Sequence, residues 1–125
     1  MADLLTAINL TREVRLTECG RVADNFYTRL VGLLNDKTLE YGDGLWIKHC
    51  NSIHSIGMRF KFDAIFLDKN LRAVHLVREM KPWRISKMVF SAHSVLEIPA
   101  GLISQTVTEL GDQFEMRTDI FPAIR

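Results

Sequence analysis

The chemically reactive side chains of this chain are concentrated in one short segment. Residues 50–63 read CNSIHSIGMRFKFD and combine a thiol, an imidazole, a guanidinium and a carboxylate, at Cys50, His54, Arg59 and Asp63. Asp63 leads directly into the apolar run AIFL, and a carboxylate buried among apolar residues needs hydrogen-bond donors or must stay protonated. We therefore expect a site in this segment, although its composition names no reaction.

The segment contains the groups of a nucleophilic catalytic site. Cys50 and His54 are four residues apart, so a turn can bring them together, and a neighbouring imidazole favours the reactive thiolate. With Asp63 to orient the imidazole of His54, the three residues would form the catalytic site of a hydrolase or transferase. Each also has an explanation without chemistry, because a free cysteine is often simply buried and a neutral histidine often bonds the backbone. The other cysteine, Cys19, has no nearby histidine or acid and is expected to be structural.

A ligand-binding pocket is the main alternative interpretation of the same segment. The forked guanidinium of Arg59 can hold an anion, or it can balance an acid such as Asp63 or Glu97. Glu97 lies between two apolar residues of an expected strand, and strand alternation places it on the solvent side. The expected pocket is built from Cys50, Ser52, His54, Met58, Arg59 and Asp63.

The sequence predicts neither a metal site nor a cofactor. Zinc sites usually contain two paired-ligand motifs, whereas this chain has one loose Cys-x3-His pair, Cys50 and His54. The adjacent His49 would point away from Cys50 if the strand continued. Glycine-rich phosphate loops, the Gly-x-Ser-x-Gly elbow and the His-Glu-x-x-His motif are all absent from the sequence.

Composition limits the function classes further. The chain has 125 residues with 16 Lys and Arg against 15 Asp and Glu, a length that fits a single domain over residues 1–125. Because these charges are scattered, the basic footprint of a nucleic-acid binder is missing. No apolar run is long enough to span a membrane, and the acid Asp3 argues against a secretory signal. We expect a cytoplasmic protein with reduced cysteines whose partner is a small molecule or another protein.

Hydrophobic periodicity predicts an α+β fold. Apolar residues at helical spacing behind Asp24 predict one clear amphipathic helix, and residues 102–110 could form a second, short one. The DKNL turn at 68–71 predicts a hairpin of the strands on either side of it. The expected sheet is mainly antiparallel and strongly curved or partly closed. Its strands are predicted at 8–18, 45–49, 62–67, 72–80, 94–98 and 113–118.

Three blocks of this sequence resemble a known family. The pattern Cys-x-x-Ile-His-x-x-x-Met-Arg-Phe-x-Phe-Asp-x-x-Phe-Leu-Asp follows RLVGLL at 29–34 and precedes VLEIPAG at 95–101. In this order the blocks resemble the domain of unknown function 192 family, over roughly residues 21–117. The resemblance implies a small prokaryotic domain without an assigned activity, with Lys61 and Gly57 departing from the residues common in the family.

The family resemblance and the residues together favour a small ligand-binding or accessory domain. The Cys50 hydrolase or transferase described above remains the first alternative. A protein interaction module is the second, and it would use an edge of the sheet or a surface ledge at Trp83, which follows Pro82 and precedes Arg84.

Overall fold

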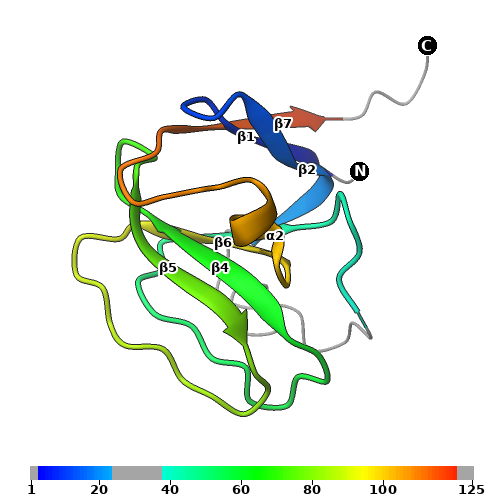
Figure 1. Cartoon of the computed structure of the whole chain (residues 1–125), viewed down its shortest axis with the longest axis vertical. Coiled ribbons are helices and arrows are strands. Elements are labelled where there is room, and N and C mark those ends of the chain that lie inside the picture. The colour runs from blue at the N-terminus through cyan, green and yellow to red at the C-terminus, as the bar shows by residue number, and fades with distance from the viewer. Residues whose placement is uncertain (1–2, 24–37, 121–125) are drawn as a thin grey trace.

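The structure is a computed structural model that describes residues 3–23 and 38–120, with only the backbone described at 3, 119 and 120. Seven strands and one short helix make up the described part (Figure 1). In chain order they are β1 Asp3–Asn9, β2 Val14–Ala23, β3 Leu45–Lys48, β4 Phe62–Leu67, β5 Ala73–Met80, β6 Ser94–Pro99, α2 Leu102–Gln105 and β7 Phe114–Ile120.

All seven strands belong to one sheet, in the order β5-β4-β6-β3-β2-β1-β7. Neighbouring strands are antiparallel except for β2 and β3, which run parallel. The outermost strands of this order, β5 and β7, approach each other at a bridge between Arg72 and Gln113, where the Phe114 N–H donates to the Leu71 carbonyl at 2.8 Å. The sheet is therefore curved so far that its two edges touch at one end.

Strand β4 separates two hydrophobic cores. All six of its residues are buried, Asp63 included, as the apolar run AIFL after Asp63 predicts for the rest of the strand. Phe62, Ala64 and Phe66 pack into one core, whereas Ile65 and Leu67 pack into the other, because successive side chains of a strand point to opposite faces. Helix α2 adds its buried Leu102 and Ile103 to the second core.

The predicted α+β class is wrong for the described part of the chain. That part consists of one mixed sheet and a single helix of four residues, α2. This helix lies at the start of the segment 102–110, where the second, short helix was predicted. The predicted amphipathic helix falls on residues 24–37 and lies outside the described residues. The strand predicted at 8–18 is two antiparallel strands, β1 and β2, which a turn at residues 10–13 connects. This turn contains neither glycine nor proline, the residues that usually mark a turn in a sequence. The alternation of polar and apolar residues continues through it, and the turn was therefore not predicted.

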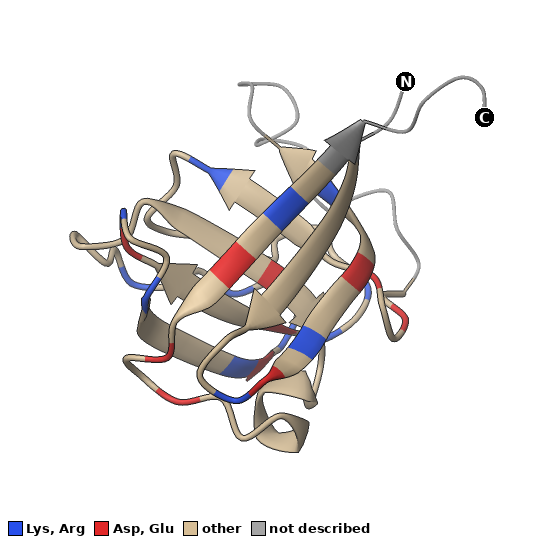
Figure 2. Ribbon diagram, turned by 90° about the horizontal axis from the view of Figure 1, so that it is seen from above, with Lys and Arg blue, Asp and Glu red and all other residues tan. Residues whose placement is uncertain are grey.

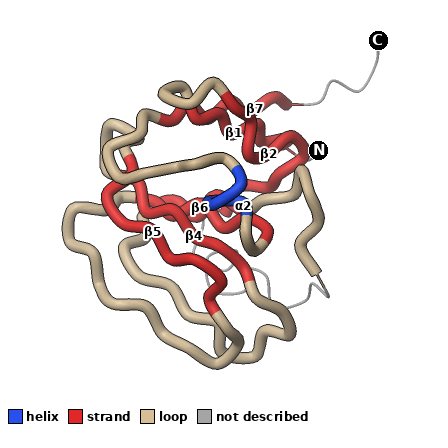
Figure 3. Tube along the Cα trace, viewed as in Figure 1, coloured by secondary structure: helices blue, strands red, loops and turns tan. Residues whose placement is uncertain are grey.

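The hairpin predicted around residues 68–71 is confirmed as β4 and β5. Beyond it, two long loops lie side by side at the end of the molecule remote from β1, β2 and β7 (Figures 1 and 3). We call these two segments, 49–61 and 81–93, the loop ribbon. Three of the backbone hydrogen bonds that join them are Ser55 N–H to Arg84 O (2.8 Å), Ser86 N–H to Ile53 O (2.9 Å) and Val89 N–H to Asn51 O (2.8 Å).

Candidate functional site

Asp63 is fully buried and accepts two backbone hydrogen bonds. Its Oδ1 accepts the N–H of Glu79 and its Oδ2 accepts the N–H of Ile103, both at 2.8 Å. The register between β4 and β5 shifts at this point, and a bulge of this kind leaves an N–H without a partner in the ladder. The prediction that Asp63 needs donors is confirmed, and both donors are backbone N–H groups outside the segment 50–63. Asp63 connects β4 to β5 and to α2.

His54 is exposed on the loop ribbon, where its backbone bridges to Ile85. Its Nδ1 accepts the N–H of Ile56 at 3.2 Å, the backbone-bonded arrangement that needs no catalytic role. Cys50 is half-buried, and its Sγ donates to the carbonyl of Ser52 at 3.0 Å. Within the described residues, no hydrogen bond connects Cys50, His54 and Asp63, so the predicted catalytic group is not assembled by such contacts.

The other predicted pocket residues lie in different environments. Ser52 is half-buried, Met58 is buried in the first core and Arg59 is exposed. Of the six residues expected to form one pocket, Cys50 alone lines either of the surface depressions described next.

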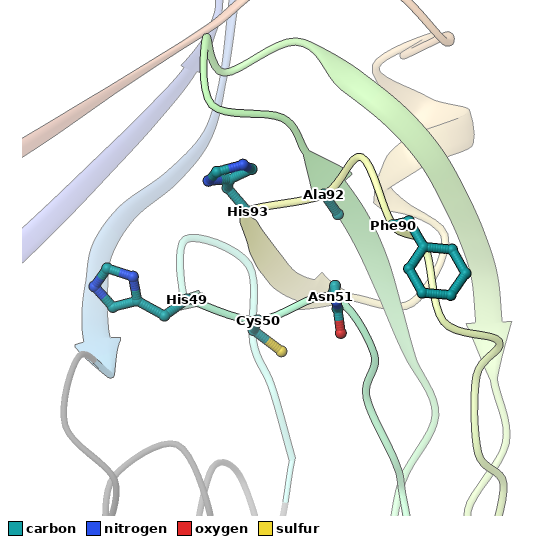
Figure 4. A pocket seen from close by; sticks show the side chains of 6 residues that line it. All are labelled: His49, Cys50, Asn51, Phe90, Ala92 and His93. Carbon is teal, nitrogen blue, oxygen red and sulfur yellow. The ribbon is translucent and has the colours of Figure 1, made fainter.

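An open depression of about 310 Å³ lies where β3 ends and β6 begins (Figure 4). The imidazoles of His49 and His93 lie on one side of it and the ring of Phe90 lies on the other, with Cys50 and Asn51 between them. Its lining residues are His49, Cys50, Asn51, Phe90, Ala92 and His93. We call it the histidine depression.

A second open depression, of about 330 Å³, adjoins the first and shares His49 and His93 with it. We call it the lysine depression because Lys48 and Lys69 contribute to its lining. The full lining is Trp46, Lys48, His49, Asp68, Lys69, Leu71, His93 and Ser94. The Nζ of Lys48 lies 4.9 Å from the centre of the Trp46 ring, a cation–π contact that places this ammonium group above the indole.

Two polar groups of the lysine depression differ in how they are bonded. Asp68 closes the turn between β4 and β5, because its Oδ1 accepts the N–H groups of Asn70 at 2.8 Å and Arg72 at 2.9 Å. The indole N–H of Trp46 is buried and has no acceptor within the described part of the chain. Buried donors are usually satisfied, so this N–H is an exception within the described part of the chain.

Strand pairing brings the two histidines together. Lys48 of β3 is in register with Ser94 of β6, so His49 and His93 are the next residues outward on the two antiparallel strands. The Cys50 N–H donates to the His93 carbonyl at 3.1 Å, which fixes this corner. His49 has a φ of 55°, a left-handed conformation uncommon for residues other than glycine. His93 is not among the predicted site residues, although pairing the predicted strands 45–49 and 94–98 places it next to His49.

Glu97 is buried, which corrects the prediction that it faces solvent. It lies in register with Leu45 of β3 and Ala64 of β4, two residues of the first core, so its strand is central in the sheet and its side chain lies on the face of that core. Burial raises the pKa of Glu97 to about 8. At neutral pH this side chain is therefore mainly a protonated, uncharged acid.

The sequence profile of the DUF192 family, described as "Uncharacterized ACR", matches residues 9–116. The chain belongs to this family. It is 33% identical over 111 residues to the UPF0127 protein of Pyrococcus furiosus, an alignment that covers 86% of this chain and 95% of that protein. It is 37% identical over 101 residues to the UPF0127 protein of Pyrococcus horikoshii, with 78% and 87% covered.

A solved structure shows the same fold. The crystal structure of a protein of unknown function from Novosphingobium aromaticivorans has a TM-score of 0.77 with 19% sequence identity, covering 89% of this chain and 82% of that one. Within the described residues of our structure, no helix is both long and apolar enough to cross a bilayer.

Proposed function

We propose that this DUF192 member is a small binding domain that holds an anionic ligand in the paired histidine and lysine depressions. One observation carries the proposal: His49 and His93, brought together by the pairing of β3 with β6, line both depressions. A ligand that contacts both imidazoles reaches both hollows at once. Hydrogen-bond donors that converge on one concave surface are typical of small-molecule sites.

The charges around the lysine depression favour an anion. Lys48 and Lys69 provide two ammonium groups to its lining. The single carboxylate of the lining, Asp68, uses one oxygen to close its turn. A phosphate or carboxylate group would therefore meet more donors than acceptors. Phe90 at the far side of the histidine depression could contact an apolar part of the same ligand.

Fluorescence titration tests the proposal directly. Trp46 lines the lysine depression, and a Trp83→Phe background removes the other tryptophan of the chain. Titration with inorganic phosphate and separately with succinate should change Trp46 emission saturably and show which anion class binds more tightly. Lys48→Ala combined with Lys69→Ala should weaken binding at least tenfold, since each removed charge contributes about 1 kcal/mol or more in a partly desolvated site.

Lys87→Ala is the matched control, because Lys87 is an exposed lysine that lines neither depression. Its affinity for the anions should equal that of the parent protein. A linear, non-saturating response to both anions would overturn the proposal, and so would an equal loss of affinity in the Lys87 control.

Thiol chemistry at Cys50 is a second candidate function, favoured by its place between the two histidines and Phe90 in the histidine depression. In this arrangement His49 or His93, rather than His54, lines the same hollow as the thiol. Iodoacetamide labelling of Cys50 across pH tests it, with Cys19→Ser as background. A labelling midpoint well below that of a free thiol supports a nucleophile, whereas an ordinary midpoint or an unreactive thiol argues against one.

A further inference from the structure

The loop ribbon exposes an unusual set of large apolar side chains. Five of the nine exposed large hydrophobic residues in the described part of the chain lie on it. Four come from one stretch of eight residues, 83–90: Trp83 is 65% exposed, Ile85 72%, Met88 53% and Phe90 84%. The fifth, Ile56, is 41% exposed on the facing loop. Exposed apolar side chains gathered on one ribbon in this way are typical of a contact site for a partner or a membrane.

Backbone pairing holds these side chains outward. Ile85 bridges to His54 across the ribbon, and both are exposed, because residues that pair across two strands share a face. Val89, between Met88 and Phe90, is buried in the first core instead. Val89 therefore holds this part of the ribbon against the core, and the exposed residues on either side of it stay at the surface.

The ribbon also carries positive charge without any acid. The two segments contain Arg59, Lys61, Lys81, Arg84 and Lys87, and neither contains Asp or Glu. Lys61 pairs with Glu79 of β5 at 3.0 Å. Lys81, Arg84 and Lys87 form no ion pair with other described residues, and the Nη1 of Arg84 contacts the carbonyls of Pro82 and Trp83 at 3.4 Å.

The other end of the molecule differs in its charge pattern. Seen from the side of β1, β2 and β7, basic and acidic residues alternate over the strands (Figure 2). Arg12 there contacts both Glu109 and Asp112 at 3.0 Å, and Arg117 pairs with Glu115. The acid-free surface is thus a local feature of a chain whose net charge is only +1.

We propose that the loop ribbon is a peripheral contact surface for anionic lipid. Trp83, Ile85, Met88 and Phe90 would enter the headgroup region of a bilayer, and the ammonium and guanidinium groups of 81–87 would meet lipid phosphates and carboxylates. A bilayer accepts protruding apolar side chains without matching pockets, whereas a protein partner must present a pocket for each anchor. The loop ribbon presents protruding apolar side chains with basic residues between them, and this arrangement fits a lipid surface better than it fits a protein partner. Phe90 also lines the histidine depression, whereas Trp83, Ile85 and Met88 line neither depression.

Vesicle binding by the full chain tests this inference. We expect co-sedimentation with vesicles of equal parts phosphatidylcholine and phosphatidylserine, weakened by salt, and little with phosphatidylcholine alone. Each basic residue near an anionic surface contributes about 1 kcal/mol, or about fivefold in affinity. Changing Lys81, Arg84 and Lys87 together to glutamine should therefore lower affinity about a hundredfold. Trp83→Ser with Phe90→Ser should also reduce binding at least tenfold.

The matched control removes exposed apolar residues elsewhere. Leu10 is 46% and Leu110 is 62% exposed away from the ribbon, and the Leu10→Ser and Leu110→Ser double variant should bind vesicles like the parent. Brominated lipid should quench the tryptophan emission of the unaltered protein but much less that of Trp83→Phe, a comparison that does not depend on destabilising variants. Absence of binding to anionic vesicles at low salt would overturn the inference, as would equal quenching in both proteins or selective binding of the ribbon to an acidic peptide instead.

Discussion

The buried acid Glu97 makes a strong prediction about pH. Its pKa is raised from 4.5 to about 8 because burial penalises the charged carboxylate. The folded protein therefore binds this proton more tightly than the unfolded chain, so the stabilising contribution is complete below pH 4.5 and is lost as the pH rises through about 8. Between these values the free energy of unfolding should fall by up to about 1.4 kcal/mol per pH unit.

Glu97→Gln removes the ionisation while keeping the shape of the side chain. Urea unfolding of both proteins between pH 5 and pH 8 gives the comparison, and the difference between the two curves isolates Glu97 from other titrating groups. We expect the wild-type protein to lose several kcal/mol relative to the variant across this range, a large share of the stability of a typical domain. Parallel curves would contradict this prediction, because they would mean that the carboxylate is ionised or solvated in the folded state.

Three further predictions follow from the bonding of other titratable groups. Asp63→Ala should lower the free energy of unfolding by about 2–4 kcal/mol, because the buried Ile103 N–H loses its acceptor; urea unfolding and amide exchange at Ile103 measure it, and a loss below about 1 kcal/mol contradicts it. Burial raises the pKa of Asp112, but hydrogen bonds led by that of Arg12 outweigh it and the net pKa is lowered. Arg12→Ala should therefore move the Asp112 pKa upward in an NMR titration. The ionised Asp112 stabilises the wild type above the pKa that this residue has in the unfolded chain, and this stabilisation is lost as the pH falls. The variant should lack it. Burial lowers the pKa of His75 below 6.5. An NMR titration should therefore find the midpoint of His75 below 6.5, and the free energy of unfolding should fall as acid protonates this residue. A midpoint at or above 6.5 would contradict the prediction.

The sequence predicted the local elements of the fold better than its class. Residues 64–67 form an apolar run next to a turn that Asp68 closes, so β4, β5 and their connection followed from local signals. The parallel pairing of β2 with β3 depends on residues far apart in the chain, and no local pattern specifies it. Alternation also misplaced Glu97, because it assumes one solvated face and both faces of β6 are covered.

The candidate site was predicted only in part for a similar reason. Cys50 was found from its residue type, but His93 becomes its neighbour through the pairing of β3 with β6. The partners of Asp63 are backbone N–H groups at a bulge and at α2, which residue types cannot indicate. The nearness of His54 and Asp63 in sequence suggested a contact that the strand geometry does not make.

An anionic ligand should bind where β3 ends and β6 begins. The most direct measurement is an NMR titration of the ¹⁵N-labelled chain with inorganic phosphate, following every assigned amide. We expect saturable shifts that are largest at Lys48, His49, Lys69 and His93, with a common dissociation constant. Shifts that never saturate, or that centre on residues 54–59 and leave His49 and His93 unchanged, would contradict it.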